Sequence, residues 1–154
     1  MILQGVYLVW YTLNRMKESG KAGYQELEHT ADWQLKAWGA DVPSLFEQAA
    51  LGMVDLSGIQ LAANPRVTKE LRLEAPDREI LLVDFLSELL YLGETENIGF
   101  DDFDLQVEDA VLHAKIEGAP IESQTKEIKA VTYHNLKIEE RPDGVWEVNI
   151  VFDV

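Results

Sequence analysis

The sequence predicts one α+β domain in which a mixed or antiparallel β-sheet packs against two main helices. Two observations support this fold class. The segments 41–58 and 77–92 carry apolar residues at helical spacing, whereas most other apolar segments alternate with polar residues, as strands with one exposed face do. The length of 154 residues is typical of one domain and allows a substantial hydrophobic core.

The predicted domain covers residues 24–154 and follows an N-terminal extension, residues 1–23. The apolar stretch Ile2–Leu13 in this extension is too short to cross a membrane, and it lacks the basic flank and the cleavage site of a signal peptide. We expect either an extension outside the fold, with Met16 as an alternative start, or a docking helix or additional strand. The candidate functional residues are therefore expected within residues 24–154.

The first elements of the domain are predicted from short-range patterns. Residues 24–28 and 33–38 are expected to be strands, because apolar and polar residues alternate in the second of them. A helix should follow, with Asp41 as its N-cap and Pro43 in its first turn. Its apolar residues form one face, and Gly58 is a typical helix stop.

The residue pattern in the middle of the chain predicts a strand, then a central helix, then a pair of strands. Residues 66–74 alternate, and the helix that opens after Pro76 is apolar on nearly all sides, so it should be covered by other elements. Residues 100–117 predict two strands around Glu108 and Asp109. The glycine-bearing segment 118–125 is expected to be a loop.

Two strands, 126–140 and 145–154, are expected to complete the chain as a hairpin. Arg141-Pro-Asp-Gly144 is typical of a type I turn followed by a left-handed glycine. Continued from this turn, the register places apolar residues together on one face and puts Tyr133 opposite Asp153. Lys129 would then lie about 13 Å along the strand from the partner of Asp153, at four residues of strand rise.

Composition limits the classes of function. The chain has no cysteine, which excludes disulfides, thiolate catalysis and thiolate metal sites, and which fits a reducing, cytoplasmic location. Its formal net charge of −15 argues against direct binding of nucleic acid or of an acidic membrane surface. Cations and basic protein surfaces are the expected partners.

Acidic residues at two places predict a metal site. Asp32 lies between two predicted strands, where it could be a metal ligand or could cap its own turn. Asp153 and the terminal carboxylate of Val154 stand at the end of a strand whose alternation continues to the last residue, so we expect that end to be docked. Carboxylate oxygens are the donors that magnesium, calcium and manganese prefer.

Other polar residues are weaker candidates. Asp84 lies within the most apolar helix, so it should meet a cation such as Lys129, meet a metal, or face a solvated edge. His134 has the parity of the core-facing row and is expected to be a packed core residue. His29 and His113 are no stronger as candidates, and no histidine pair has metal-ligand spacing.

The same residues give the chain a resemblance to the archease family, over about residues 24–154 and in the family's order. The matching segments are Tyr24-Gln-Glu-Leu-Glu-His-Thr-Ala-Asp32, Val83-Asp-Phe-Leu-Ser-Glu-Leu-Leu-Tyr91, Glu127-Ile-Lys-Ala-Val-Thr-Tyr-His134 and Trp146-Glu-Val-Asn-Ile-Val-Phe-Asp-Val154. The resemblance implies an accessory protein, and not an enzyme by itself. Archeases promote the guanylylation and repeated turnover of the RNA-splicing ligase that joins tRNA halves, and some broaden its nucleotide choice.

The resemblance also implies which residues matter. The family's metal-binding positions fall on Asp32, Asp153 and Val154, with calcium, magnesium or manganese as the expected cation, and a functionally sensitive lysine falls on Lys129. The family's final residue is often isoleucine, and valine here leaves the terminal carboxylate unchanged. Two alternatives stay open: a hydrolase that uses the metal for its own catalysis, and a metal-free protein-interaction module.

Overall fold

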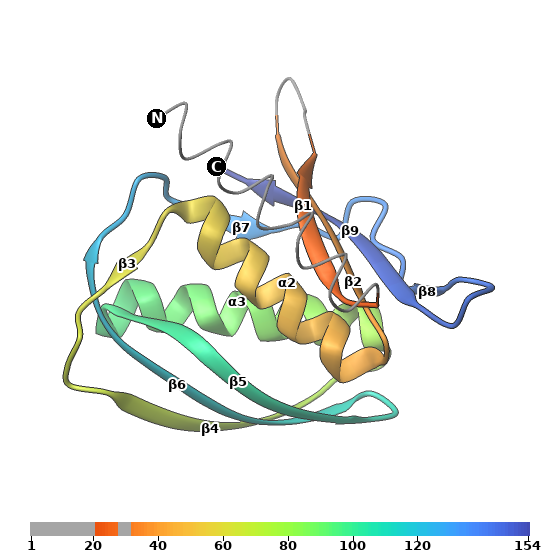
Figure 1. Cartoon of the computed structure of the whole chain (residues 1–154), viewed down its shortest axis with the longest axis horizontal. Coiled ribbons are helices and arrows are strands. Elements are labelled where there is room, and N and C mark those ends of the chain that lie inside the picture. The colour runs from red at the N-terminus through yellow and green to blue at the C-terminus, as the bar shows by residue number, and fades with distance from the viewer. Residues whose placement is uncertain (1–20, 28–31) are drawn as a thin grey trace.

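The computed structural model describes residues 21–27 and 32–154, and within them two helices lie between two antiparallel β-sheets (Figure 1). The first sheet has the order β1–β2–β9–β7, and β8 also pairs with β9. Its strands are β1 (Gly23–Leu27), β2 (Trp33–Gly39), β7 (Ala130–Val131), β8 (Glu139–Glu140) and β9 (Trp146–Asp153).

The second sheet is built around one long strand, β6, which pairs with the three others. Its strands are β3 (Gln60–Leu61), β4 (Val67–Glu74), β5 (Ile98–Glu108) and β6 (Val111–Ser123). The helices α2 (Val42–Ser57) and α3 (Arg78–Glu96) each contact strands of both sheets. The predicted α+β class with two helices and antiparallel sheet pairing is confirmed, and the strands divide into two sheets.

The two helices begin where the sequence predicts. The Asp41 carboxylate accepts a hydrogen bond from the backbone N–H of Ser44, and the helix ends at Gly58, whose φ of 65° is left-handed. At α3 the Asp77 carboxylate accepts a hydrogen bond of 2.8 Å from the backbone N–H of Ile80. Each cap satisfies a backbone donor that has no partner within the first turn of the helix.

Replacement of the cap at α3 should weaken the fold measurably. We expect Asp77→Ala to lower the free energy of unfolding by about 1 kcal/mol, because the N–H of Ile80 loses its acceptor and the helix dipole loses a favourable charge. Urea denaturation would measure the change. Asp77→Asn retains an acceptor oxygen and should cost less, and equal losses in both variants would contradict the capping explanation.

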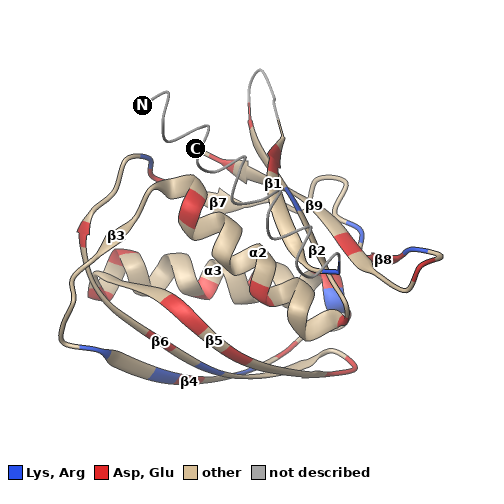
Figure 2. Cartoon of the chain, in the orientation of Figure 1, with Lys and Arg blue, Asp and Glu red and all other residues tan. Residues whose placement is uncertain are grey.

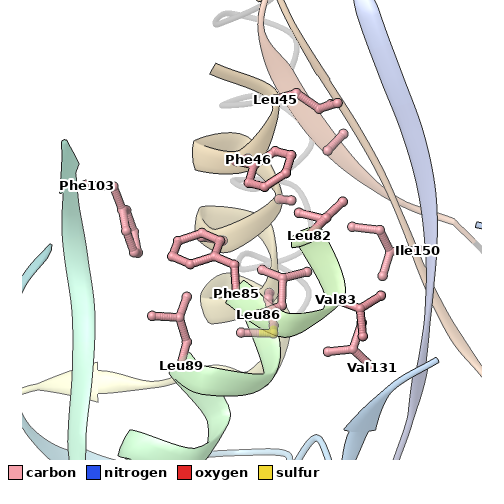
Figure 3. Close-up of a cluster of buried hydrophobic side chains, with 14 of the residues drawn as sticks. Leu45, Phe46, Leu82, Val83, Phe85, Leu86, Leu89, Phe103, Val131 and Ile150 are labelled. Atoms are coloured by element: carbon pink, nitrogen blue, oxygen red, sulfur yellow. The ribbon is translucent and has the colours of Figure 1, made fainter. Parts of the chain in front are cut away.

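The core lies between the sheets and is centred on α3. Phe85 is fully buried, and its ring stacks on Phe46 of α2 and meets the edge of Phe103 of β5, with centroids 6.2 Å apart in both pairs. On the other side of the helix, Val83 faces Val131 and Ile150 of the first sheet (Figure 3). The all-round apolar pattern of this helix therefore has a structural reason, because both of its sides are covered.

The expected loop at 118–125 is wrong, because β6 continues without a break to Ser123. Gly118 pairs with Phe100 of β5 on one side and Val67 of β4 on the other. A Cβ atom at Gly118 would lie 1.8 Å from the carbonyl oxygen of Gly99. This glycine therefore marks a close approach of two backbones inside a sheet.

The final turn has the predicted form. The backbone N–H of Arg141 donates to the carbonyl of Val145 at 2.8 Å, and Gly144 adopts a left-handed φ of 85°. The two residues before the turn, Glu139 and Glu140, pair with β9 in the predicted register. The turn chemistry therefore determines pairing only close to the turn.

The register predicted for the rest of this hairpin is wrong by three residues. Ala130, and not Tyr133, lies opposite Asp153. Residues 132–138 leave the sheet through a turn, in which Asn135 has a φ of 51° and the Leu136 N–H donates to the Tyr133 carbonyl at 3.2 Å. Tyr133 is consequently 59% exposed.

The turn carries a carboxylate with a lowered pKa. Asp143 accepts a hydrogen bond from the backbone N–H of Val145 at 3.0 Å and lies 3.2 Å from the Arg141 guanidinium, and both hold its pKa below the ordinary range. The contribution of Asp143 to stability is therefore present above the pKa of an unfolded aspartate and is lost as the pH falls through the folded value.

A titration followed by NMR would test this interpretation of the turn. We expect the side-chain carboxyl carbon of Asp143 to titrate at a lower pH than that of an aspartate in an unstructured peptide. Gly144→Pro should remove the left-handed conformation and bring the midpoint back toward the peptide value. An Asp143 midpoint equal to the peptide value in the unsubstituted protein would contradict the prediction.

Neither described helix is both long enough and apolar enough to cross a membrane.

Candidate functional site

Three strand ends meet at the C-terminus of the chain. Trp33, the first residue of β2, lies opposite Phe152 of β9, so Asp32 and Asp153 each lie one residue beyond the last pair of these two strands. On the other side of β9, Ala130 of β7 lies opposite Asp153. The central position of β9 between β2 and β7 therefore places the end of the chain between two other segments (Figure 1).

The face of the sheet on which the acidic side chains lie follows from strand alternation. Phe152 is fully buried, so its neighbour Asp153 points to the opposite face, where it is exposed. Asp32, which lies just before β2, is also exposed. Val154 is half-buried and packs against the core, so the end of the chain is docked and holds the terminal carboxylate near the two side chains.

The donor set at this end fits a hard divalent cation. Asp32, Asp153 and the terminal carboxylate of Val154 supply only oxygen donors, the type that magnesium, calcium and manganese prefer. Within residues 21–27 and 32–154 no group of three or more His, Cys, Asp and Glu side chains could hold a metal ion. The candidate set at the chain end contains only two side chains, because its third donor is the main-chain carboxylate of Val154.

Lys129 lies directly beside the acidic end. Its backbone N–H donates to the carbonyl of Asp153 at 2.8 Å. The predicted separation of about 13 Å is therefore wrong, because it depended on a register that residues 132–138 interrupt. The Lys129 side chain is exposed and lines a cleft beside the strand ends.

A second lysine near the site was not predicted. The ammonium of Lys126 lies 5.5 Å from the ring centroid of Trp33, the residue that follows Asp32. This cation–π contact joins the 124–129 segment to the start of β2. An aromatic residue next to a candidate ligand was visible in the sequence, but its lysine partner is more than ninety positions away and only the fold brings them together.

The remaining candidates lie elsewhere. His134 is exposed in the segment that leaves the sheet, so its prediction as a packed core residue is wrong, and its Nε2 lies 3.3 Å from the Asn135 amide nitrogen. Asp84 is half-buried on α3, and no ion pair joins it to Lys129 or to another described residue. His113 is exposed on β6, and His29 lies outside the described residues.

Acidic residues surround the site at longer range. Figure 2 shows them on both helices, on β5 and at the end of β9. The strongest basic pairing is remote: Arg66, before β4, contacts Asp101 at 2.6 Å and Glu117 at 3.3 Å, which raises the pKa of its guanidinium. The basic residues of the second sheet are thus partly neutralised, and the strand ends carry carboxylates with Lys126 and Lys129 nearby.

Comparison with known proteins identifies the family. Residues 24–154 match the model of the Archease protein family. The chain belongs to the archease family. It is 38% identical to the protein archease of Methanosarcina acetivorans, over 90% of this chain and all of that protein. It is 34% identical to the protein archease of Pyrococcus furiosus, over 85% of this chain and 98% of that protein.

Solved archease structures share the fold. Protein 1598 of Methanobacterium thermoautotrophicum superposes with a TM-score of 0.63 at 28% identity, over 86% of this chain and 99% of that one. An archease from Thermotoga maritima, described as a possible chaperone, also gives 0.63, at 27% identity over 84% and 96% of the two chains. The α+β arrangement of this chain is thus the archease fold.

Proposed function

We propose that the chain is an accessory protein of the RNA-splicing tRNA ligase. In this role it would promote guanylylation and multiple turnover of the ligase through a divalent-cation site formed by Asp32, Asp153 and the terminal carboxylate of Val154. The observation that carries the proposal is the pairing of β2 and β7 with β9, which gathers these carboxylates and Lys129 at one end of a sheet. Membership of the archease family supports it.

Each residue has a distinct task in this proposal. Asp32, Asp153 and the chain terminus hold or position the cation by their oxygens, and docking of Val154 keeps the terminus from fraying. A bound divalent cation would supply positive charge to phosphate oxygens. Lys129, fixed through its backbone to Asp153, would neutralise a phosphate or hold a carboxylate.

The charge of the chain supports a protein partner. With a formal net charge of −15 the chain is poorly suited to hold RNA itself, whereas it is complementary to the basic cleft of an enzyme that binds RNA. Electrostatic complementarity of this kind raises association rates and falls with ionic strength. The proposal therefore also predicts salt-sensitive association with the ligase.

The deciding experiment is a ligation assay with the cognate ligase in excess RNA substrate. Addition of the purified chain should convert a single turnover into many turnovers and should increase the guanylylated fraction of the ligase. No gain in either quantity would contradict the proposal. Hydrolysis of nucleotides or RNA ends by the chain without any ligase would instead favour a metal-dependent hydrolase.

The ligand set has its own test. Isothermal titration with manganese should give a lower affinity for Asp32→Ala than for the unsubstituted chain, because one oxygen donor is removed. Equal affinities would remove Asp32 from the site. Activation of the ligase that survives removal of divalent cations from the chain would favour the metal-free interaction module.

A further inference from the structure

A cleft with a volume of about 490 Å³ lies between the C-terminal halves of α2 and α3, the start of β5 and the 121–129 segment. Its walls combine polar and apolar surface in equal parts. The apolar part includes Met53, Leu89, Leu90, Ile98, Ile121 and Ile128. The cleft is open to solvent, so it can receive a side chain from outside the chain, and the apolar part of its wall favours an apolar one.

A glycine forms part of the cleft wall. Gly93 lines it from α3, where a glycine is less favourable than alanine because of its backbone entropy. Neither conformation nor packing requires a glycine here: its φ is not in the left-handed region, and a Cβ would make ordinary contacts of 3.7 Å with Ile121 and with the Ile98 carbonyl. A methyl group therefore fits at this position, whereas a larger side chain would extend into the cleft.

The cleft is lined by two carboxylates and one lysine, Lys129. Glu94 and Glu127 are exposed, and neither forms an ion pair within the described part of the chain. Like the chain as a whole, the rim that these two glutamates form is therefore complementary to a basic group. The apolar part of the wall beside these glutamates fits an apolar side chain that is flanked in its own sequence by lysine or arginine.

The cleft adjoins the candidate metal site through one residue, Lys129. Lys129 lines the cleft, and its backbone is hydrogen-bonded to Asp153. The cleft wall at 124–129 is held to the end of α2, because the carbonyl of Ser57 accepts hydrogen bonds from the backbone N–H groups of Thr125 and Lys126. A protein that contacts Lys129 at the strand ends would thus be adjacent to this cleft.

We propose that the cleft is a docking pocket for the partner ligase, which inserts an apolar side chain flanked by a basic residue. This inference rests on the proposed function, because it takes the ligase as the protein at the metal site. The apolar side chain would anchor the complex by desolvation, and Glu94 and Glu127 would pair with the flanking cation. In this complex the cleft would provide affinity for the ligase, and the metal site at the strand ends would activate it.

The first test fills the cleft. Gly93→Leu should weaken binding of the cognate ligase, measured by isothermal titration calorimetry, by about tenfold or more, because the anchoring pocket is occupied. Gly93→Ala adds only a methyl group with ordinary contacts and should leave the affinity within about twofold. Thermal melting would verify that both variants fold. Equal affinity of the leucine variant and the unsubstituted chain would overturn the inference.

The second test reverses the rim charge without entering the cleft. Glu94→Lys combined with Glu127→Lys should reduce affinity by about tenfold or more at low salt. The matched control is Glu108→Lys with Glu140→Lys, because these residues are exposed, lie outside the cleft and give the same change in net charge. If the control variant loses as much affinity for the ligase as the rim variant, the loss is a general effect of charge, and the role of the rim is overturned.

The two proposals fail in different ways. If the unsubstituted chain neither binds nor activates the ligase, the proposed function is wrong, and the docking-pocket inference is wrong as well. If the chain activates the ligase but the cleft variants bind and activate normally, only the docking pocket is wrong. Reduced binding of Gly93→Leu, with its activation restored at high protein concentration, would support both.

Discussion

Asp153→Ala is expected to abolish multiple-turnover activation of the ligase while leaving the fold intact. Asp153 is exposed at the end of β9, so its side chain contributes little to the core, but it lies between Asp32 and the 129–130 segment. Loss of one carboxylate should lower cation affinity by at least about tenfold, since loss of groups that only support a ligand already costs that much. Ligation turnover and manganese titration would measure the two effects.

The control for this prediction is another exposed aspartate in the same chain. Asp104→Ala on β5 removes the same charge at a strand of the second sheet and should leave activation unchanged. Asp153→Asn retains the size of the side chain but removes its charge, and it should resemble the alanine variant. Full activation by Asp153→Ala would show that the terminal carboxylates are not the working site.

Phe85→Ala is expected to lower the free energy of unfolding by about 3–5 kcal/mol. The side chain is fully buried in the middle of α3 and contacts aromatic rings from α2 and β5, so truncation leaves a cavity between layers that cannot close without moving both. Such a loss is a large part of the stability of a domain of this size. Denaturant unfolding with a global fit would give the value.

The same helix provides the comparison variant. Tyr91 is 57% exposed, and Tyr91→Ala should change stability by no more than about 0.5 kcal/mol. Phe85→Leu retains an apolar side chain and should cost less than Phe85→Ala. Similar losses for Phe85→Ala and Tyr91→Ala would contradict the central packing of α3.

Sequence patterns were sufficient where the interactions are local. Asp41 and Asp77 cap the helices that follow them, and Gly58 and Gly144 have the left-handed conformations expected of a helix end and a hairpin turn. Each of these features depends on hydrogen bonds or dihedral angles within four residues. Local chemistry therefore determines them before any distant contact forms.

The pairing of β7 with β9 was decided by burial in the tertiary structure. The predicted register would have set His134 beside Phe152 on the core face, whereas the structure sets Val131 there. Val131 packs near Val83 and Ile150, so the shift buries an apolar side chain against α3 and releases His134 to solvent (Figure 3). A turn determines the register only for strand residues that remain in the sheet. Because residues 132–138 leave the sheet, the turn does not determine how the residues before them pair with β9.

The sequence by itself thus determined the α+β class, the starts of both helices, the end of α2, the final turn and the acidic character of the chain end. Only the tertiary structure decided that Lys129 lies beside Asp153, that Gly118 is part of a strand, and that Gly93 and Lys129 line the same cleft. The reason is that these features depend on which distant segments pack together. That choice is made by the burial of apolar surface over the whole chain and not by any short run of residues.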